Sequence, residues 1–463
     1  MAAAATLRGG TLTSDPEVAA GIRMFEAWLN SQMEYRGLPG VAVGVVCDQE
    51  LVWSRGFGYA DVEKKVPVTP KTLFRMASNT KMFTATAVMQ LRDAGKLRLD
   101  DPVARHLPWF QTQPAGEDDG PVRIEHLLTH GSGLPREAAF PYWSTFAFPT
   151  AGEIRKTVAS QRAAYAPDTR WKYSNLAFAL AGMVVEEVSG EPYGAYLRRH
   201  ILDPLGMTAS SLDTPAGGLA TGYGRRMPDG SRKRMPFLDC KGIGPAGGLT
   251  SNVEDMARFI ALQLGKGGAG GRGVLDGATL REMHRVRILE NNWTRGYGIG
   301  FMVKREREKV YVGHGGSLAG YKTHTMFRPG DKVGVVVLTN GDDSRPEQIA
   351  DRAFQMIGEP LAKAYAPKKA PAWDPAWRRF AGLYRSVWGD IEVVELAGEL
   401  GLIDPTSEDP VPQMNKLVPA GDGTFRLEGP SGGAAVGEPV AFVEEAGRVR
   451  AVRVGGSVSE RVR

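Results

Sequence analysis

Ser78 and Lys81 stand three residues apart at the predicted start of a helix. From Lys81 to about Ala94, apolar residues recur every three or four positions, and no proline interrupts them. Residues three apart on a helix share a face, so an amine would lie beside a hydroxyl. A serine hydroxyl becomes a nucleophile when a base takes its proton, and a helix N-terminus favours the negative charge that develops. The pair could therefore perform nucleophilic catalysis.

The Ser-x-x-Lys pattern alone proves little, because a chain of this length contains about one such pattern by chance. A helix-capping serine followed by a solvated lysine is the simpler interpretation. The rest of the chain must supply the missing parts of a site.

Two further short patterns occur once each in the chain. Tyr173-Ser174-Asn175 immediately precedes a predicted helix, and His314-Gly315-Gly316 lies between two predicted strands. Each also has a structural interpretation. The first could be a core aromatic residue followed by a helix-capping asparagine, and the second could be a glycine turn beside an incidental histidine.

Taken together and in this order, the three patterns resemble the serine β-lactamase and penicillin-binding-protein superfamily, in which Ser-x-x-Lys is an established motif. The class C-like branch is the most similar. It includes family VIII carboxylesterases, D-aminopeptidases and D-alanyl-D-alanine peptidases. The resemblance covers about residues 17–360, and three more stretches share it: Thr129-His130-Gly131-Ser132-Gly133-Leu134, Gly247-Gly248-Leu249 and Tyr297-Gly298-Ile299-Gly300-Phe301.

The resemblance implies a role for each residue of the three patterns. Ser78 would be the nucleophile that accepts the acyl group, and Lys81 and Tyr173 would share the role of base. Asn175 would bind an amide or acyl carbonyl of the substrate. The substrate-binding strand would comprise His314, Gly315, Gly316 and Ser317, with the N–H groups of Ser78 and Ser317 as the oxyanion hole.

The identity of the general base stays open at this point. Lysine has a pKa near 10.4, so Lys81 needs a decrease of about three units, roughly 4 kcal/mol, to act as a base at neutral pH. Burial could cause that decrease. Alternatively, Lys81 stays charged and lowers the pKa of Tyr173, which then becomes the base.

His314 departs from the Lys-Thr-Gly pattern of most β-lactamases, which this chain lacks. A lysine at that position holds the carboxylate of a β-lactam, whereas an unperturbed histidine is mostly neutral at pH 7. We therefore expect esters, or amides and peptides with D-amino acids, to be better substrates than β-lactams. Hydrolysis of β-lactam antibiotics is the alternative function.

The fold class expected is α/β. Residues 1–16 form an extension, and residues 17–365 form a hydrolase domain in which an antiparallel sheet is flanked by helices, with an all-helical lobe at about 76–288. Strands predicted at Gly40–Cys47 and Leu51–Ala60 should share that sheet with strands at Gly298–Val303, Val310–Gly313, Lys322–Phe327 and Lys332–Thr339. Helices are predicted at Pro16–Arg36, Ile124–His130, Ala151–Ser160, Asn175–Ser189, Pro192–Ile201, Val253–Leu264 and Glu347–Ile357.

A linker is predicted at 366–372, because Pro and Lys dominate there. Residues 373–463 consist of short alternating runs divided by Gly, Asp and Pro, which predicts a small antiparallel β-barrel domain. It resembles the lipocalin-like barrels appended to some D-aminopeptidase relatives. Strands are expected at Phe380–Tyr384, Ile391–Leu396, Leu400–Ile403, Lys416–Pro419, Thr424–Leu427, Val440–Glu444 and Arg448–Val454.

Composition excludes several classes of function. The 463 residues are 42% hydrophobic and 24% charged, with a net charge of +5 that is mostly dispersed. The one dense basic run, between Arg225 and Arg234, is interpreted as a solvated loop, so no nucleic-acid partner is expected. No apolar run is long enough to span a membrane. The N-terminus does not read as a signal peptide, so a cytoplasmic protein is expected unless a leader has been removed.

No metal or other cofactor is expected. Cys47 and Cys240 are too few for a disulfide framework, and His126 and His130 lack the His-Glu-x-x-His order of metallopeptidases, since Glu125 precedes His126. The one Gly-x-Ser-x-Gly match, Gly429–Gly433, has no histidine after it, unlike an α/β-hydrolase. A non-catalytic member of the fold would show broken motifs, and all three are intact. A small-molecule ester, amide or peptide is the expected partner, and the oligomeric state stays open.

Overall fold

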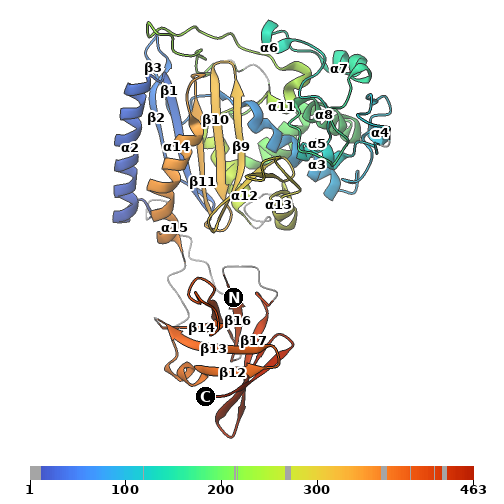
Figure 1. Cartoon of the computed structure of the whole chain (residues 1–463). Helices are drawn as coiled ribbons and strands as arrows, with labels where there is room; N and C mark the ends of the chain where they lie inside the picture. The colour runs from blue at the N-terminus through green and yellow to red at the C-terminus, as the bar shows by residue number, and fades with distance from the viewer. Residues whose placement is uncertain are drawn as a thin grey trace. The chain divides into compact units, whose positions relative to one another are not determined.

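A computed structural model describes residues 12–463 apart from 118, 213, 214, 216, 266–272, 367–372, 397, 422 and 430–434. The chain divides into two compact units, Met1–Ala366 and Pro367–Arg463 (Figure 1). The predicted linker, apart from its first residue, lies outside the described residues, as do residues 1–11 of the predicted extension. No described helix combines the length and apolar content that crossing a bilayer requires.

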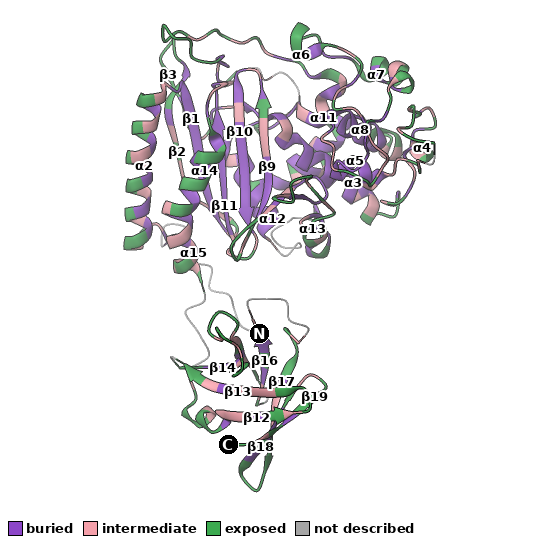
Figure 2. Ribbon diagram, in the orientation of Figure 1, coloured by how far each residue is buried: buried purple, intermediate pink, exposed green. Residues whose placement is uncertain are grey.

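A nine-stranded sheet forms the framework of the first unit, and every neighbouring pair of strands is antiparallel. Its order is β3 (Val66–Pro67), β2 (Glu50–Asp61), β1 (Gly40–Cys47), β11 (Val333–Thr339), β10 (Tyr321–Arg328), β9 (Lys309–Leu318), β8 (Met302–Glu306), β7 (Gly296–Tyr297) and β6 (Ile288–Leu289). Because β1 pairs with β11, the two ends of this unit build one sheet, as the sequence predicted. Figure 2 shows β1, β10 and β11 buried at the centre.

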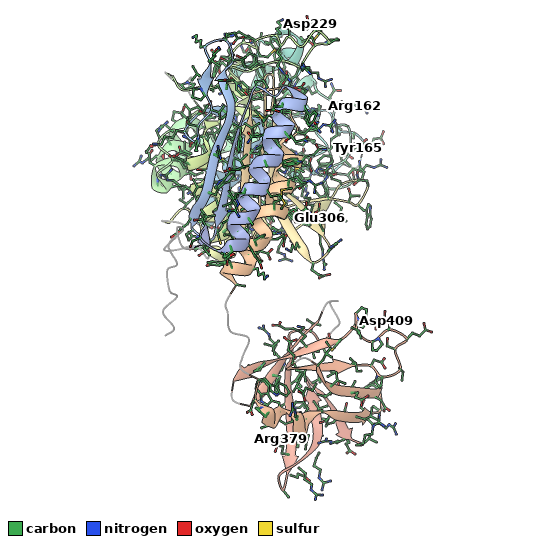
Figure 3. The ribbon with its side chains drawn as sticks, turned by 90° about the vertical axis from the view of Figure 1, so that its left-hand side faces the viewer. Arg162, Tyr165, Asp229, Glu306, Arg379 and Asp409 are labelled. Atoms are coloured by element: carbon green, nitrogen blue, oxygen red, sulfur yellow. The ribbon has the colours of Figure 1, made fainter. Side chains whose placement is uncertain are left out.

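One face of the sheet is covered by the first and last helices of this unit. Helix α2 (Pro16–Arg36) begins where the Asp15 carboxylate accepts two backbone N–H groups, and it ends at Gly37, whose φ is 55°. Figure 3 shows α2 beside the C-terminal helical segment, which comprises α14 (Pro346–Ala353), a π-helical turn (Phe354–Gly358) and α15 (Glu359–Tyr365). Phe25 and Leu29 of α2 are fully buried in this layer.

The opposite face carries the helical lobe and, within it, the helix that follows Ser78. Helix α12 (Val253–Leu264) packs on β1 and β11, and its Phe259 ring stacks on Phe83 of α3 (Thr80–Asp93) at 4.0 Å. Helix α3 packs in turn on α8 (Asn175–Ser189), which is buried from Asn175 to Val185. The remaining helices of at least four residues in this lobe are α4 (Val103–His106), α5 (Ile124–Thr129), α6 (Tyr142–Thr145), α7 (Ala151–Thr157), α9 (Tyr193–Leu197), α11 (Gly244–Gly247) and α13 (Gly277–Met283).

Most predicted elements are confirmed within a few residues, and three need correction. The strand predicted at Gly298–Val303 begins only at Met302. The strand predicted at Val310–Gly313 is too short, because β9 continues through His314 to Leu318. The last helix continues past Ile357, because Gly358 keeps a helical backbone and Pro360 falls in the first turn of α15, where no N–H is needed.

The basic run lies in a mostly exposed loop, as expected from the sequence, although two of its arginines form ion pairs. The Arg232 side chain is only 8% exposed, and it pairs with Asp343 at 2.6 Å and donates to the Gly37 carbonyl. Arg234 pairs with Asp61 at 3.2 Å. These contacts attach the loop to the edge of the sheet.

The second unit is a closed eight-stranded barrel, as predicted. Consecutive strands pair around it, and β19, which the sequence analysis missed, closes the barrel against β12. Its core combines valine and leucine side chains with aromatic ones, among them Phe380, whose ring stacks at 4.0 Å on the partly buried Phe442. The strands are β12 (Gly382–Ser386), β13 (Gly389–Leu396), β14 (Glu399–Ile403), β15 (Asn415–Gly421), β16 (Thr424–Glu428), β17 (Pro439–Glu445), β18 (Arg448–Val454) and β19 (Ser457–Arg461).

Candidate active site

A cleft of about 1220 Å³ opens beside Ser78. The structure brings the sequence-predicted residues together there, although they come from three distant parts of the chain. Lys81 is the exception, because it lies beneath the cleft wall with no exposed surface. The predicted residues that line the cleft are Ser78, Tyr173, Asn175, His314, Gly315, Gly316 and Ser317.

Ser78 lies in a short 3₁₀ turn, Ala77–Asn79, that leads directly into α3. Ala77 has a φ of 48°, a left-handed conformation that costs a non-glycine residue energy and that often occurs at functional sites. Asn79 holds the turn against β10, because its Nδ2 donates to the Thr323 Oγ1 at 2.8 Å. The turn leaves Ser78 partly exposed while its neighbours are buried.

Two side chains reach the Ser78 hydroxyl. The Tyr173 hydroxyl donates to Ser78 Oγ at 2.7 Å, and Lys81 Nζ lies 3.2 Å from the same oxygen. Both distances are within the range of hydrogen bonds. Either side chain could therefore exchange a proton with Ser78.

Lys81 has two further partners, and both are acceptors. Its Nζ donates to Asn175 Oδ1 at 2.8 Å and to the Ala246 carbonyl at 2.7 Å. A neutral amine has two hydrogens and one lone pair, so the two acceptors occupy both hydrogens. The lone pair then faces the Ser78 hydroxyl.

Burial lowers the pKa of Lys81 to about 7, because a charged ammonium loses its hydration beneath the cleft wall. Glu137 opposes that decrease by its negative charge, and the positive charge of Arg136 adds to it. The decrease matches the one that the sequence analysis required of a base.

The pKa of Tyr173 is shifted upward, in the opposite direction to that of Lys81. Burial raises the pKa of its hydroxyl to about 12, although the hydrogen bond to Ser78 and the charge of Arg136 lower it. The Arg136 guanidinium lies 5.4 Å from the centre of the Tyr173 ring, and the His130 ring lies 4.3 Å from it on centroids. A Tyr173 anion is thus disfavoured, and the phenol remains a donor at neutral pH.

Asn175 is oriented by Glu137, a residue that the sequence analysis did not single out. The Asn175 Nδ2 donates to both carboxylate oxygens of Glu137, at 2.9 and 3.1 Å. Since a carboxylate only accepts, the amide must turn its oxygen toward Lys81. The Tyr142 hydroxyl also donates to Glu137, and Arg136 pairs with it at 2.9 Å.

His314 is 2% exposed, and both of its ring nitrogens have partners within the protein. Its Nδ1 lies 2.5 Å from the Gly315 carbonyl, and its Nε2 contacts the Tyr297 hydroxyl. Burial and the charge of Lys81 lower its pKa to about 3, so the ring is neutral, as expected from the sequence. This ring has no nitrogen left to bind a substrate carboxylate.

Strand β9 presents a free edge to the cleft beyond Gly313. Strand β8 pairs with β9 only as far as Met302 opposite Gly313, so the described residues place no strand beside His314–Leu318 on that side. Gly316 lets this edge approach Ser78, since a Cβ there would lie 2.2 Å from Thr323 Oγ1 and 2.5 Å from the Met76 carbonyl. Only glycine fits at this position.

Arg75 secures the segment that carries Ala246. It is 1% exposed, and it donates to the carbonyls of Gly248 and Leu238 and to Thr250 Oγ1 at 2.8–3.0 Å. Neither Arg75 nor Glu137 belongs to a recognised short motif. In the sequence, Arg75 and Glu137 stand out only as charged residues beside apolar runs, which does not indicate a role in the site.

The residues that could have supported other chemistries do not form alternative sites. His126 Nδ1 and His130 Nδ1 each accept a backbone N–H at 3.1 Å, from Arg123 and Ser174 respectively. Within the described part of the chain, no group of three or more His, Cys, Asp or Glu side chains could hold a metal ion. Both cysteines are buried and unpaired, and the Gly429–Gly433 match lies mostly outside the described residues.

The chain is similar in sequence and fold to several known proteins. The solved structure of an octameric penicillin-binding protein homologue from Pyrococcus abyssi is 26% identical, has a TM-score of 0.64 and covers 95% of this chain and 99% of its own. D-amino acid amidase from Ochrobactrum anthropi SV3 is also 26% identical, with a TM-score of 0.60, over 73% of this chain and 99% of its own.

Protein flp of Staphylococcus aureus (strain N315) is 26% identical over 311 residues, which are 65% of this chain and 60% of that protein. The chain thus matches less than two thirds of the length of this curated relative. The family model described as Beta-lactamase matches residues 25–357, which include Ser78, Lys81, Tyr173 and His314. The chain belongs to the Beta-lactamase family.

Proposed function

We propose that this protein is a serine hydrolase that forms an acyl-enzyme on Ser78 and acts on esters or on amides and peptides with D-amino acids. The observation that carries the proposal is the set of contacts around Lys81. A buried amine with two acceptor-only partners and a pKa of about 7 directs its lone pair at a serine hydroxyl 3.2 Å away.

In the first step, neutral Lys81 takes the Ser78 proton while Ser78 Oγ attacks the substrate carbonyl. Of the two bases that the sequence left open, this geometry supports Lys81, because Tyr173 keeps its proton at neutral pH. The Tyr173 hydroxyl, 2.7 Å from Ser78 Oγ, passes its proton to the leaving group and takes back a proton from the Lys81 ammonium, so that Tyr173 is again a phenol and Lys81 again a neutral amine. The N–H groups of Ser78 and Ser317 would stabilise the oxyanion.

In the second step, water attacks the acyl-enzyme, and the same amine serves as its base. Asn175 keeps the amine in place by accepting from Lys81 while donating to Glu137. Gly316 brings the β9 edge close to the carbonyl that is attacked. His314 and Tyr297 support this edge from within rather than contacting the substrate.

The substrate preference rests on two observations. His314 is neutral and has no free nitrogen, so the charge that holds β-lactam carboxylates in Lys-Thr-Gly enzymes is missing at this position. In addition, one relative at 26% identity is named a D-amino acid amidase.

The test is a parallel hydrolysis assay on 4-nitrophenyl butyrate, D-alanine 4-nitroanilide and nitrocefin. We expect turnover of the ester or the D-anilide to exceed that of nitrocefin, and Ser78→Ala to abolish it. Ser31→Ala, at an exposed serine of α2, is the matched control and should match the parent. Activity that survives in Ser78→Ala would refute the site, and fastest turnover of nitrocefin would refute the substrate preference.

A further inference from the structure

The cleft beside Ser78 has an uneven distribution of charge. Among its lining residues are four cationic side chains, Arg136, Lys172, Lys322 and Arg345, and one carboxylate, Glu347. Arg136 is neutralised by its ion pair with Glu137. The other three cations make no ion pair or side-chain hydrogen bond with the described residues.

Lys322 lies next to the predicted oxyanion hole. It is directly opposite Ser317 in the pairing of β9 with β10, so both side chains point to the same face of the sheet, the face on which α14 packs. The neighbouring Thr323 points to the other face and contacts the Ser78 turn. The Lys322 side chain is half-buried, which limits the volume in which its charge can move. Burial raises the pKa of Asp342 and the positive charge of Lys322 acts to lower it, but the two side chains do not form an ion pair.

Arg345 is held near Lys322 by a short chain of contacts. Thr339 of β11 lies opposite Lys322, and its Oγ1 donates to the Lys322 carbonyl at 2.8 Å. The same oxygen contacts the hydroxyl of Ser344, the residue before Arg345. Two unpaired cations therefore lie at the same end of the cleft, formed by β10 and the start of α14.

His324 adds a neutral polar group to the same cleft. Its ring is 4% exposed, and its Nε2 has no hydrogen-bond partner among the described residues. That nitrogen itself has no exposed surface, so it is not among the groups that would contact a ligand.

We infer that Lys322 and Arg345 form a subsite for an anionic group, a carboxylate or a phosphate, on the substrate that acylates Ser78. This inference rests on the proposed function and narrows its substrate class. It also changes the conclusion drawn from His314, which was that the cleft lacks a cation for a substrate carboxylate. Here Lys322 of β10 and Arg345, just before α14, would supply the positive charge that the lysine of a Lys-Thr-Gly motif supplies elsewhere. Glu347 tunes the subsite by partly offsetting their charge.

The test uses matched pairs of esters that differ only in charge. One pair is mono-4-nitrophenyl glutarate and its methyl ester, which place the charge on the acyl side. The other is 3-carboxyphenyl butyrate and its methyl ester, which place it on the leaving group. The measured quantity is the ratio of kcat/KM for the acid to that for the neutral ester, because this ratio cancels any general loss of folded enzyme.

We expect at least one pair to favour the acid. Lys322→Gln and Arg345→Gln should each lower that ratio about five- to tenfold, the effect of one charge-assisted hydrogen bond at a partly exposed site. Glu347→Gln should raise the ratio about two- to threefold, since it removes a like charge. Lys64→Gln and Arg281→Gln, at exposed residues outside the cleft, are the matched controls and should leave the ratio unchanged.

A ratio at or below one for both pairs, or one that neither Lys322→Gln nor Arg345→Gln lowers, would overturn the subsite while leaving the hydrolase proposal intact. Failure to turn over any of these esters, 4-nitrophenyl butyrate or D-alanine 4-nitroanilide would refute the hydrolase proposal instead. In that case, calorimetric titration with monomethyl glutarate and dimethyl glutarate decides the subsite. If monomethyl glutarate binds more tightly than dimethyl glutarate and Arg345→Gln weakens its binding, the subsite is supported. Equal binding of the two compounds overturns the subsite.

Discussion

The two ends of the cleft differ in how their charged groups are satisfied. Around Ser78, Lys81 has three partners and Asn175 is held at both its oxygen and its nitrogen. At the other end, Lys322 and Arg345 have no ion pair with the described residues. A closed network fixes positions to a fraction of an ångström, as chemistry requires, whereas unpaired charge remains available to a ligand. We therefore propose that the first end serves the reaction and that the second serves recognition.

Removing the amine of Lys81 should reduce the rate more than a change at Gly316 or Glu137, because the enzyme then lacks its proposed general base. Lys81→Ala should lower kcat/KM for a neutral ester by about 10²- to 10⁴-fold, the usual contribution of a general base. Steady-state kinetics on 4-nitrophenyl butyrate measure this loss. Lys64→Ala is the control, and a Lys81→Ala enzyme within tenfold of the parent would assign the base to another residue.

Moving the free edge of β9 away from Ser78 should have the next largest effect. In Gly316→Ala the new methyl group would overlap Thr323 Oγ1 and the Met76 carbonyl, so the strand must shift. A displacement of about 1 Å can cost about 10²-fold in rate, and we expect a loss of that order. Kinetics on the neutral ester would show it.

Gly315→Ala is the matched control for that change. Its Cβ would lie 3.3 Å from the His324 Nδ1 and 3.8 Å from the Thr323 carbonyl, with no closer contact, so we expect a much smaller loss. Equal losses in the two variants would contradict the close approach of Gly316 to the nucleophile.

Removing the charge of Glu137 should have a smaller effect that is visible in the pH profile. Because Glu137 raises the pKa of Lys81, Glu137→Gln should shift the acidic limb of kcat/KM to lower pH. We also expect a loss of about tenfold at the plateau, since a glutamine no longer dictates which way Asn175 turns. Glu34→Gln, on the exposed face of α2, serves as the control. A limb that moves to higher pH would contradict the role assigned to Glu137.

Much of the fold could be predicted from the sequence, since α8 and α12 begin and end at the predicted residues. Their apolar periodicity and caps are local signals. The short strands β6 and β7 and the full length of β9 were missed, because two-residue strands and a glycine-rich edge have no alternating pattern to detect.

The grouping of the candidate site residues could also be predicted, because three short motifs contain them and the structure brings them together. Their environment could not, since it depends on contacts between distant segments. Glu137 reaches Asn175 across 38 positions, and Ala246 reaches Lys81 across 165. His314 alone suggested that the cleft has no cation for a substrate carboxylate. That inference was incomplete, because Lys322 and Arg345 lie on other segments of the chain.

The pH dependence of kcat/KM for 4-nitrophenyl butyrate tests the central claim most directly. A base with a lowered pKa is active once it is deprotonated, so the rate should rise as the pH increases through about 7 and then level off. Lys81→Ala should lack this limb. A limb near 10, or one at about 7 that persists in Lys81→Ala, would contradict the claim that neutral Lys81 activates Ser78.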